Sequence, residues 1–325
     1  MVFDLRQGRI APQDYQEQDY QDKLRISGDI RVGDLNEDVR RSAGRLRMPI
    51  KDVLLPLVGE PSEQAIAAID QCVAAAGDFA ARVLALAIEQ DIDVRPQAVR
   101  PDLDNGEVAE AVRSVTDARG LLQAFNSAVL RCGVRNEQRL ERPAASDVAG
   151  TIADHARLAD LTLIPVKQDG SSEKLVEVLL FGSGRPVLLC PEELAAGLSV
   201  TFDNVVIAWD HSAPAARAVA DSLPLLQSAA TVRIITATDG KTPREVSSGE
   251  ALLVHLAEHG IKAVFEAVPI DGSSIGKVFE SYVRSHTTDL LVMGAYRHSR
   301  LNEIIWGGAT KTVIGRPPCW VMMSH

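Results

Sequence analysis

The chain has 325 residues, of which 46% are hydrophobic and only 4% aromatic, so its cores must be built mainly from Ala, Val, Leu and Ile. This length is natural for two domains, and aliphatic cores of this kind are expected where helices pack on a parallel sheet. The formal net charge of −10 opposes broad contact with a phosphate backbone, so we expect no nucleic-acid partner.

Cysteine spacing and hydropathy further narrow the class of protein to which the chain can belong. Cys72, Cys132, Cys190 and Cys319 form no Cys-x-x-Cys pair, which favours buried reduced thiols over a disulfide framework or a zinc site. The amino terminus has no apolar core of signal-peptide length, and no later stretch is apolar for long enough to span a membrane. The sequence therefore predicts a cytoplasmic protein without a membrane partner.

Residues 1–47 differ in composition from the rest of the chain. Segments such as Gln13–Asp22 are polar and show no sustained period. Such a segment cannot bury enough apolar surface to offset its ordering entropy. We expect either a disordered extension or a mis-annotated start, with the first folded domain beginning at residue 48.

From Met48 onward the chain repeats itself. The offset between matching strands falls from 152 residues (53 to 205) to 129 (160 to 289), so the first copy holds 23 extra residues. We place these residues around Asp91–Cys132, on a long predicted helix. The predicted domains are 48–195, longer by about 20 residues, and 200–325. The strands matched between the copies are Val53–Val58 with Val205–Asp210 and Asp160–Pro165 with Asp289–Gly294, and Gly184-Arg-Pro matches Gly315-Arg-Pro before a fifth strand.

Within each copy, apolar strands alternate with helices. This alternation predicts an α/β fold with two tandem doubly wound parallel-sheet domains of Rossmann-like type. In the second copy the strands are predicted near Asn204–Trp209, Val232–Thr238, Lys262–Pro269, Leu290–Gly294 and Cys319–Met323. The helices are predicted near Pro214–Leu226, Ser248–Glu258, Ser274–Ser285 and Ser299–Ile314.

The segment after Asp289 carries a glycine motif. A buried strand ends at Gly294, a polar turn follows, and the pair Gly307-Gly308 precedes the last strand. This layout resembles the universal stress protein family, whose nucleotide-binding members carry Gly-x2-Gly-x9-Gly followed by Ser or Thr. Gly294 and Gly307 take the first and third glycine positions. Arg297 stands where the second glycine belongs, and Gly308 stands where the hydroxyl residue belongs.

The resemblance implies a stress-response protein that binds ATP, with Mg²⁺, through its second domain and acts by regulation or protection, not by catalysis. It implies that Asp210 faces the adenosine end, with Ser212 beside it, while Gly294, Gly307 and Gly308 admit the phosphates. The guanidinium of Arg297, next to His298, could grip a phosphate bidentately. The Thr310 hydroxyl could replace the hydroxyl that is missing at Gly308. Ser212 is equally suited to cap the following helix.

The resemblance also implies that the two copies pair inside the chain through their last strands, Pro186–Cys190 and Cys319–Met323, and leaves further homodimerisation open. The first copy has Val58-Gly59 in place of the aspartate and Pro165 in place of the first glycine. It is therefore expected to be a structural partner.

Two other functions stay open. One is a nucleotide-free scaffold or protein-interaction module, because the glycine motif is incomplete. The other is an ATPase or an adenylyl-transferring enzyme, although no metal-binding carboxylate cluster is evident in the sequence. His255-x-x-Glu258-His259 matches a zinc peptidase pattern, yet a solvated helix face is favoured.

Overall fold

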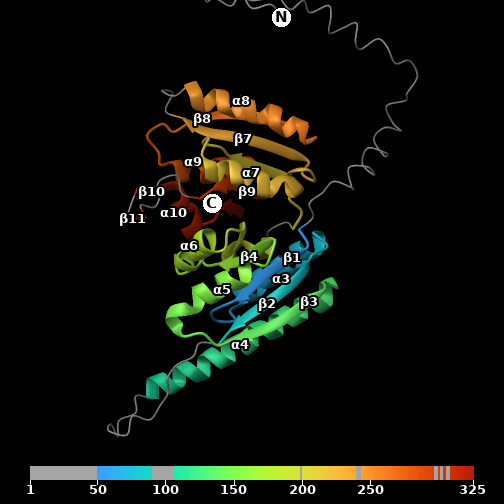
Figure 1. Ribbon diagram of the computed structural model, residues 1–325, viewed down its shortest axis with the longest axis vertical. Coiled ribbons are helices and arrows are strands. Elements are labelled where there is room, and N and C mark those ends of the chain that lie inside the picture. The colour runs from blue at the N-terminus through green and yellow to red at the C-terminus, as the bar shows by residue number, and fades with distance from the viewer. Residues whose placement is uncertain are drawn as a thin grey trace, which may run out of the picture. The chain divides into compact units, whose positions relative to one another are not determined.

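The computed structural model describes residues 50–89, 105–197, 200–238, 243–295, 299–300, 303–304 and 308–325, all of which lie in one unit of the chain, Pro49–His325. The predicted extension 1–47 falls outside these residues. Strands and helices alternate along the described chain (Figure 1). Its first half consists of β1 (Asp52–Leu57), α3 (Glu63–Asp78), β2 (Arg82–Ile88), α4 (Asn105–Cys132), β3 (Asn136–Glu141), the 3-10 turn η1 (Ala145–Asp147), α5 (Val148–Ala156), β4 (Leu161–Val166), α6 (Glu173–Gly182), β5 (Val187–Pro191) and the 3-10 turn η2 (Glu192–Gly197).

The second half repeats this succession. It consists of β6 (Asn204–Ala208), α7 (Ala213–Leu226), β7 (Thr231–Thr238), α8 (Pro243–Glu258), β8 (Ala263–Pro269), α9 (Ile275–Ser285), β9 (Leu290–Gly294), β10 (Ser299–Arg300), β11 (Glu303–Ile304), α10 (Gly308–Gly315) and β12 (Trp320–Ser324). The extra length predicted for the first copy is seen in α4, which has 28 residues where the corresponding α8 has 16.

One predicted helix is wrong over much of its length. Residues 299–300 and 303–304 pair as short antiparallel strands, and α10 begins only at Gly308. The predicted helix ran through Gly307-Gly308, and glycine in a helix interior costs about 1 kcal/mol relative to alanine. The helix therefore starts at this pair and does not run through it.

The strands form one continuous sheet in the order β3-β2-β1-β4-β5-β12-β9-β6-β7-β8. The strands of each half follow the same path and are mutually parallel, as in a doubly wound fold. The two halves meet where β5 and β12 pair antiparallel, with Leu188 opposite Met322. The predicted pairing of the two last strands is thereby confirmed. The domain limits predicted from the sequence stay a prediction.

The central strands of the sheet are buried on both faces, which explains why they are continuously apolar, whereas the edge strands β3 and β8 are more exposed. In β1, Val53 and Leu55 belong to one hydrophobic cluster, and Leu54 belongs to the cluster on the opposite face. Helices α3, α4, α7 and α8 contribute to the first cluster, and α5, α6, α9 and α10 contribute to the second. Trp320 of β12 is fully buried and packs edge-on against Phe202, so it is a core residue.

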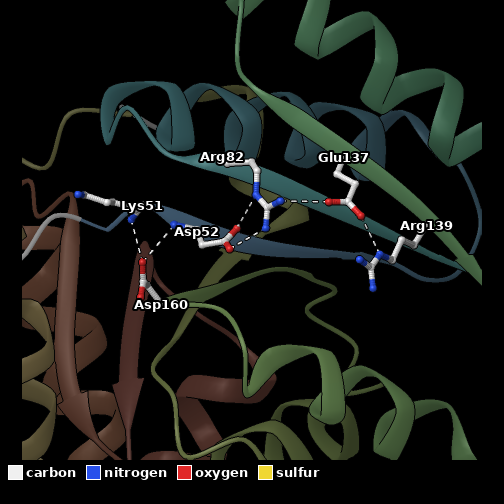
Figure 2. A network of polar contacts seen from close by, with 6 residues as sticks. All are labelled: Lys51, Asp52, Arg82, Glu137, Arg139 and Asp160. Carbon is white, nitrogen blue, oxygen red and sulfur yellow. Dashed lines mark hydrogen bonds and ion pairs between the residues drawn. The ribbon is translucent and has the colours of Figure 1, made fainter.

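The amino-terminal edge of the sheet is held by polar contacts. Asp160, just before β4, accepts hydrogen bonds from the backbone N–H groups of Lys51 and Asp52 (Figure 2). Asp289, just before β9, accepts the corresponding bond from Asn204 at 2.8 Å, so the repeat predicted from the sequence extends to this contact. These bonds tie the start of the first strand to the start of the fourth in each half.

An ion-pair network extends this edge across the first half. Arg82 pairs bidentately with Asp52, at 2.7 and 3.1 Å, and its third contact reaches Glu137 at 3.1 Å (Figure 2). Arg139 contacts the other oxygen of Glu137. The hydrogen bond to Asp52 raises the pKa of Arg82. The charged side chains at this edge form ion pairs with one another, so we interpret them as a stabilising network.

Burial of the four cysteines is less uniform than predicted. Cys72, Cys190 and Cys319 are buried, whereas Cys132 is exposed because it ends α4. In the described part of the chain, no helix is both long and apolar enough to cross a membrane.

Candidate functional site

The carboxyl-terminal edge of the second half holds Asp210 and Gly294, as the sequence predicts. The neighbouring strands β6 and β9 pair in parallel with Ala208 opposite Met293. Asp210 therefore follows the end of one strand, and Gly294 ends the other. This is also where the strand order turns. Strands β7 and β8 lie on one side of β6, whereas β9 and β12 lie on its other side. Ligands of open parallel sheets bind at such a point.

The turn after β6 is shaped by its own hydrogen bonds. The half-buried Asp210 accepts a bond from the N–H of Ser212 through Oδ1 at 3.0 Å. Ser212 Oγ accepts a bond from the N–H of Ala215 at 3.2 Å and so caps α7. His211 between them has a φ of 59°. The serine is therefore a capping residue, and the aspartate is fixed in position at the edge.

Gly294 is required by packing. A Cβ at this position would lie 2.6 Å from the carbonyl carbon of Pro214 and 2.9 Å from Cα of Ala215, and would also meet the amide nitrogen of Ala215. All three are backbone atoms at the start of α7. Glycine thus lets the end of β9 approach the amino terminus of α7 closely.

Of the remaining predicted site residues, two lie within the described residues and three lie outside them. Gly308 is exposed at the first position of α10, with nothing within 4 Å of the place a Cβ would take. Thr310 is only 4% exposed. Arg297, His298 and Gly307 lie outside the described residues. The structure thus brings Asp210, Ser212 and Gly294 to one edge, and the phosphate half of the predicted site stays a prediction.

The first half has a pocket at its corresponding edge, of about 370 Å³. Its walls come from the ends of β1 and β4, from α3, α4 and α5, and from the segment that leads into α6. The deep part is apolar and includes Ala65, Ile69, Leu121 and Ile164. The sequence assigned no site to this half, because neither the aspartate nor the glycine motif is present there.

Two opposite charges line this pocket. Lys167 directly follows β4, and Glu192 directly follows β5. Glu192 is only 8% exposed and Lys167 is half-buried. Burial raises the pKa of Glu192, and the positive charge of Lys167 opposes this rise. The sequence signal that could have directed attention here is the polar run Lys167–Lys174 after a strand that is otherwise apolar.

The two histidines of the zinc-peptidase pattern lie at the end of α8, His255 in its last turn and His259 directly after it. The rings of His255 and His259 contact each other edge-on, with centroids 4.9 Å apart, and both residues are exposed. Among the residues that the structure describes, no three His, Cys, Asp or Glu side chains gather to hold a metal ion.

The fold has counterparts of known structure. No family model matches the sequence, and no curated protein matches it. A universal stress protein from Archaeoglobus fulgidus DSM 4304 aligns with 84% of this chain and 97% of its own, at 17% identity and a TM-score of 0.59.

Two proteins from Pseudomonas aeruginosa give similar alignments. One, of unknown function, from strain PAO1 is 13% identical with a TM-score of 0.54, covering 85% of this chain and 92% of its own. The other, assigned to the universal stress proteins in strain UCBPP-PA14, is 14% identical with a TM-score of 0.54, covering 85% and 93%. The fold class predicted from the sequence is confirmed, and the chain has the fold of the universal stress proteins.

Proposed function

We propose that the protein is a universal stress protein that binds an adenine nucleotide at the carboxyl edge of β6 and β9, and that it acts by binding and not by catalysis. The observation that carries the proposal is the position of Asp210 and Gly294 on neighbouring strand ends where the strand order turns. A carboxylate at this place can accept hydrogen bonds from the ribose hydroxyls or from the base.

The residues around Asp210 fit an adenosine group. Its Oδ1 is oriented by the bond from Ser212 N–H, so the carboxylate is held at the edge before a ligand arrives. Gly294 lets the amino terminus of α7 lie against the end of β9, and a helix amino terminus favours negative charge. Arg297, His298, Gly307 and Gly308 are proposed to contact the phosphates, and Mg²⁺ would accompany ATP on those phosphates.

Calorimetric titration of the full chain with ATP and Mg²⁺ tests this proposal. Asp210→Ala is expected to weaken binding at least tenfold, since hydrogen bonds to a charged group are worth about 1.5–3 kcal/mol. Asp203→Ala is the matched control, because Asp203 is exposed and precedes the opposite end of the same strand. Arg297→Gly with Gly308→Ser restores the glycine motif and is expected to strengthen binding.

Two results would contradict the proposal. If neither the parent chain nor the restored variant binds ATP at millimolar concentration while both remain folded, there is no nucleotide site. If phosphate is released with turnover that depends on Mg²⁺ and is lost in Asp210→Ala, the protein is an ATPase, which is the enzymatic alternative.

A second candidate is a scaffold that binds no nucleotide. Capping accounts for Ser212, and the close approach of α7 accounts for Gly294, without any ligand. Absence of ATP binding in a folded chain would favour this function.

A further inference from the structure

The pocket of the first half has features of a binding site with a different ligand. We propose that it binds a small zwitterion of the amino-acid class with an apolar side chain, whose amine pairs with Glu192 and whose carboxylate pairs with Lys167. This site lies in the other half of the sheet from the proposed nucleotide site and would take a different class of ligand.

The register of the sheet places the two charges beside each other. Strands β4 and β5 pair in parallel, and their last matched residues are Val166 and Pro191. Lys167 and Glu192 directly follow these two residues, just beyond the strand ends, and both line the pocket. A ligand that carries opposite charges on one carbon atom could therefore contact both side chains at one end of the pocket.

Lys167 and Glu192 interact electrostatically, but neither side chain is held by a direct polar contact within the described residues. Among the described residues, no hydrogen bond or ion pair reaches the carboxylate of Glu192 or the ammonium of Lys167. Glu192 is nevertheless more than nine-tenths buried. A largely buried carboxylate that makes no hydrogen bond is stabilised by a donor that reaches it. The amine of a zwitterion would supply the hydrogen bonds that Glu192 lacks.

The entry to α6 favours a carboxylate near Lys167. Ser172 stands at the N-cap position of α6 but makes no side-chain capping bond to this helix. Its hydroxyl instead accepts a weak bond from the backbone N–H of Lys167 at 3.4 Å. Ser172 and Lys174 both line the pocket, so a negative group there would face Lys167, Lys174 and the positive end of the helix dipole.

Besides an amine and a carboxylate, the pocket favours a ligand with an apolar side chain. Ala65, Ile69 and Leu121 from one face of the sheet and Ile164 from the other give the pocket an apolar lining. A volume of about 370 Å³ is at the lower end of the range for small-molecule sites, and an aliphatic or aromatic side chain would pack against this lining. A nucleoside triphosphate is a poorer match, because its charge is entirely negative and the pocket also holds the carboxylate of Glu192.

Thermal-shift screening of the full chain followed by calorimetry tests the inference. The probes are L-leucine, L-isoleucine, L-methionine, L-phenylalanine and L-tryptophan. For the aromatic case, 3-phenylpropionate lacks the amine and phenethylamine lacks the carboxylate. We expect at least one amino acid to bind. Where it is phenylalanine, we expect each truncated probe to bind at least about tenfold more weakly, because each loses a charged hydrogen bond.

The two charge variants should each weaken binding of a different truncated probe. A merely structural role of Lys167 or Glu192 would affect both probes equally. Lys167→Met should weaken binding of the amino acid and of the carboxylate probe but not of the amine probe. Glu192→Gln should weaken binding of the amino acid and of the amine probe but not of the carboxylate probe. Lys262→Met and Glu258→Gln, both at exposed positions of the second half, are the matched controls.

A further variant blocks the pocket while keeping both charges, and circular dichroism checks that it is folded. Ala149→Phe narrows the pocket from α5 without touching either charge, and it should abolish binding of every probe. The inference is overturned if no amino acid of the panel binds at roughly 10 mM, or if Lys167→Met and Glu192→Gln change all probes equally. Asp210→Ala should leave amino-acid binding unchanged, so this inference and the nucleotide proposal can fail separately.

Discussion

Replacing Gly294 by alanine should destabilise the fold, whatever it does to a ligand. The added Cβ would lie 2.6 Å from the carbonyl carbon of Pro214 and 2.9 Å from Cα of Ala215. Carbon atoms in contact normally stay about 3.5–4.0 Å apart, so the backbone must move by on the order of 1 Å. Neither side can yield easily, because β9 lies between β12 and β6 and Pro214 lies in the first turn of a capped helix.

The expected cost of Gly294→Ala follows from this geometry. Overpacking costs typically 1–3 kcal/mol, and a clash with backbone atoms belongs at the upper end, about 3 kcal/mol. At about 2–4 °C per kcal/mol, the melting temperature should fall by roughly 6–12 °C. Urea unfolding of the full chain, followed by circular dichroism, measures the loss directly.

Gly308→Ala is the matched control for Gly294→Ala. Gly308 belongs to the same glycine motif but has nothing within 4 Å of its missing Cβ, so we expect a change within about 0.5 kcal/mol. If Gly294→Ala is as stable as Gly308→Ala, the packing account of Gly294 is refuted. If it is stable and also loses ATP, the glycine serves the ligand.

Three further changes test other contacts. Ser212→Ala removes the cap of α7 and should cost about 1 kcal/mol in urea unfolding, whereas Ser212→Thr should restore most of it. Arg82→Met removes the bidentate pair with Asp52 at a partly exposed edge and should cost up to about 1 kcal/mol, with a smaller cost when unfolding is repeated in 1 M salt. Burial and the bond to Glu266 raise the pKa of Tyr282 to about 12, so the folded state keeps a proton that the unfolded state loses near pH 10. The free energy of unfolding should therefore fall as pH rises from 10 to 12, and this fall should be shallower in Tyr282→Phe; equal slopes would contradict the assignment.

Local sequence patterns predicted most of the fold. The sequence placed β6, β7, β8 and β9 within about a residue of their observed limits. The signal is strongest for β6 and β9, which are buried on both faces and continuously apolar. The resemblance to the universal stress protein family implied that the two last strands would meet, and β5 and β12 do pair. The pattern failed at residues 299–304, where short strands replace a predicted helix.

The candidate site was predicted in part. Asp210, Ser212 and Gly294 lie within strand–turn–helix units whose spacing the sequence displays directly, and the structure puts them at the predicted edge. The sequence could not show that Gly294 is demanded by α7, because that contact joins residues about 80 positions apart.

By itself the sequence determined the class of fold and the repeated succession of strands and helices, because these depend on patterns along the chain, and the resemblance indicated the edge at which one half carries a motif. Only the tertiary structure decided that the other half has a pocket and that Lys167 and Glu192 share it. A pocket is made of side chains from several elements that packing alone brings together, and the pairing of β4 with β5 sets two opposite charges side by side with no trace in local spacing.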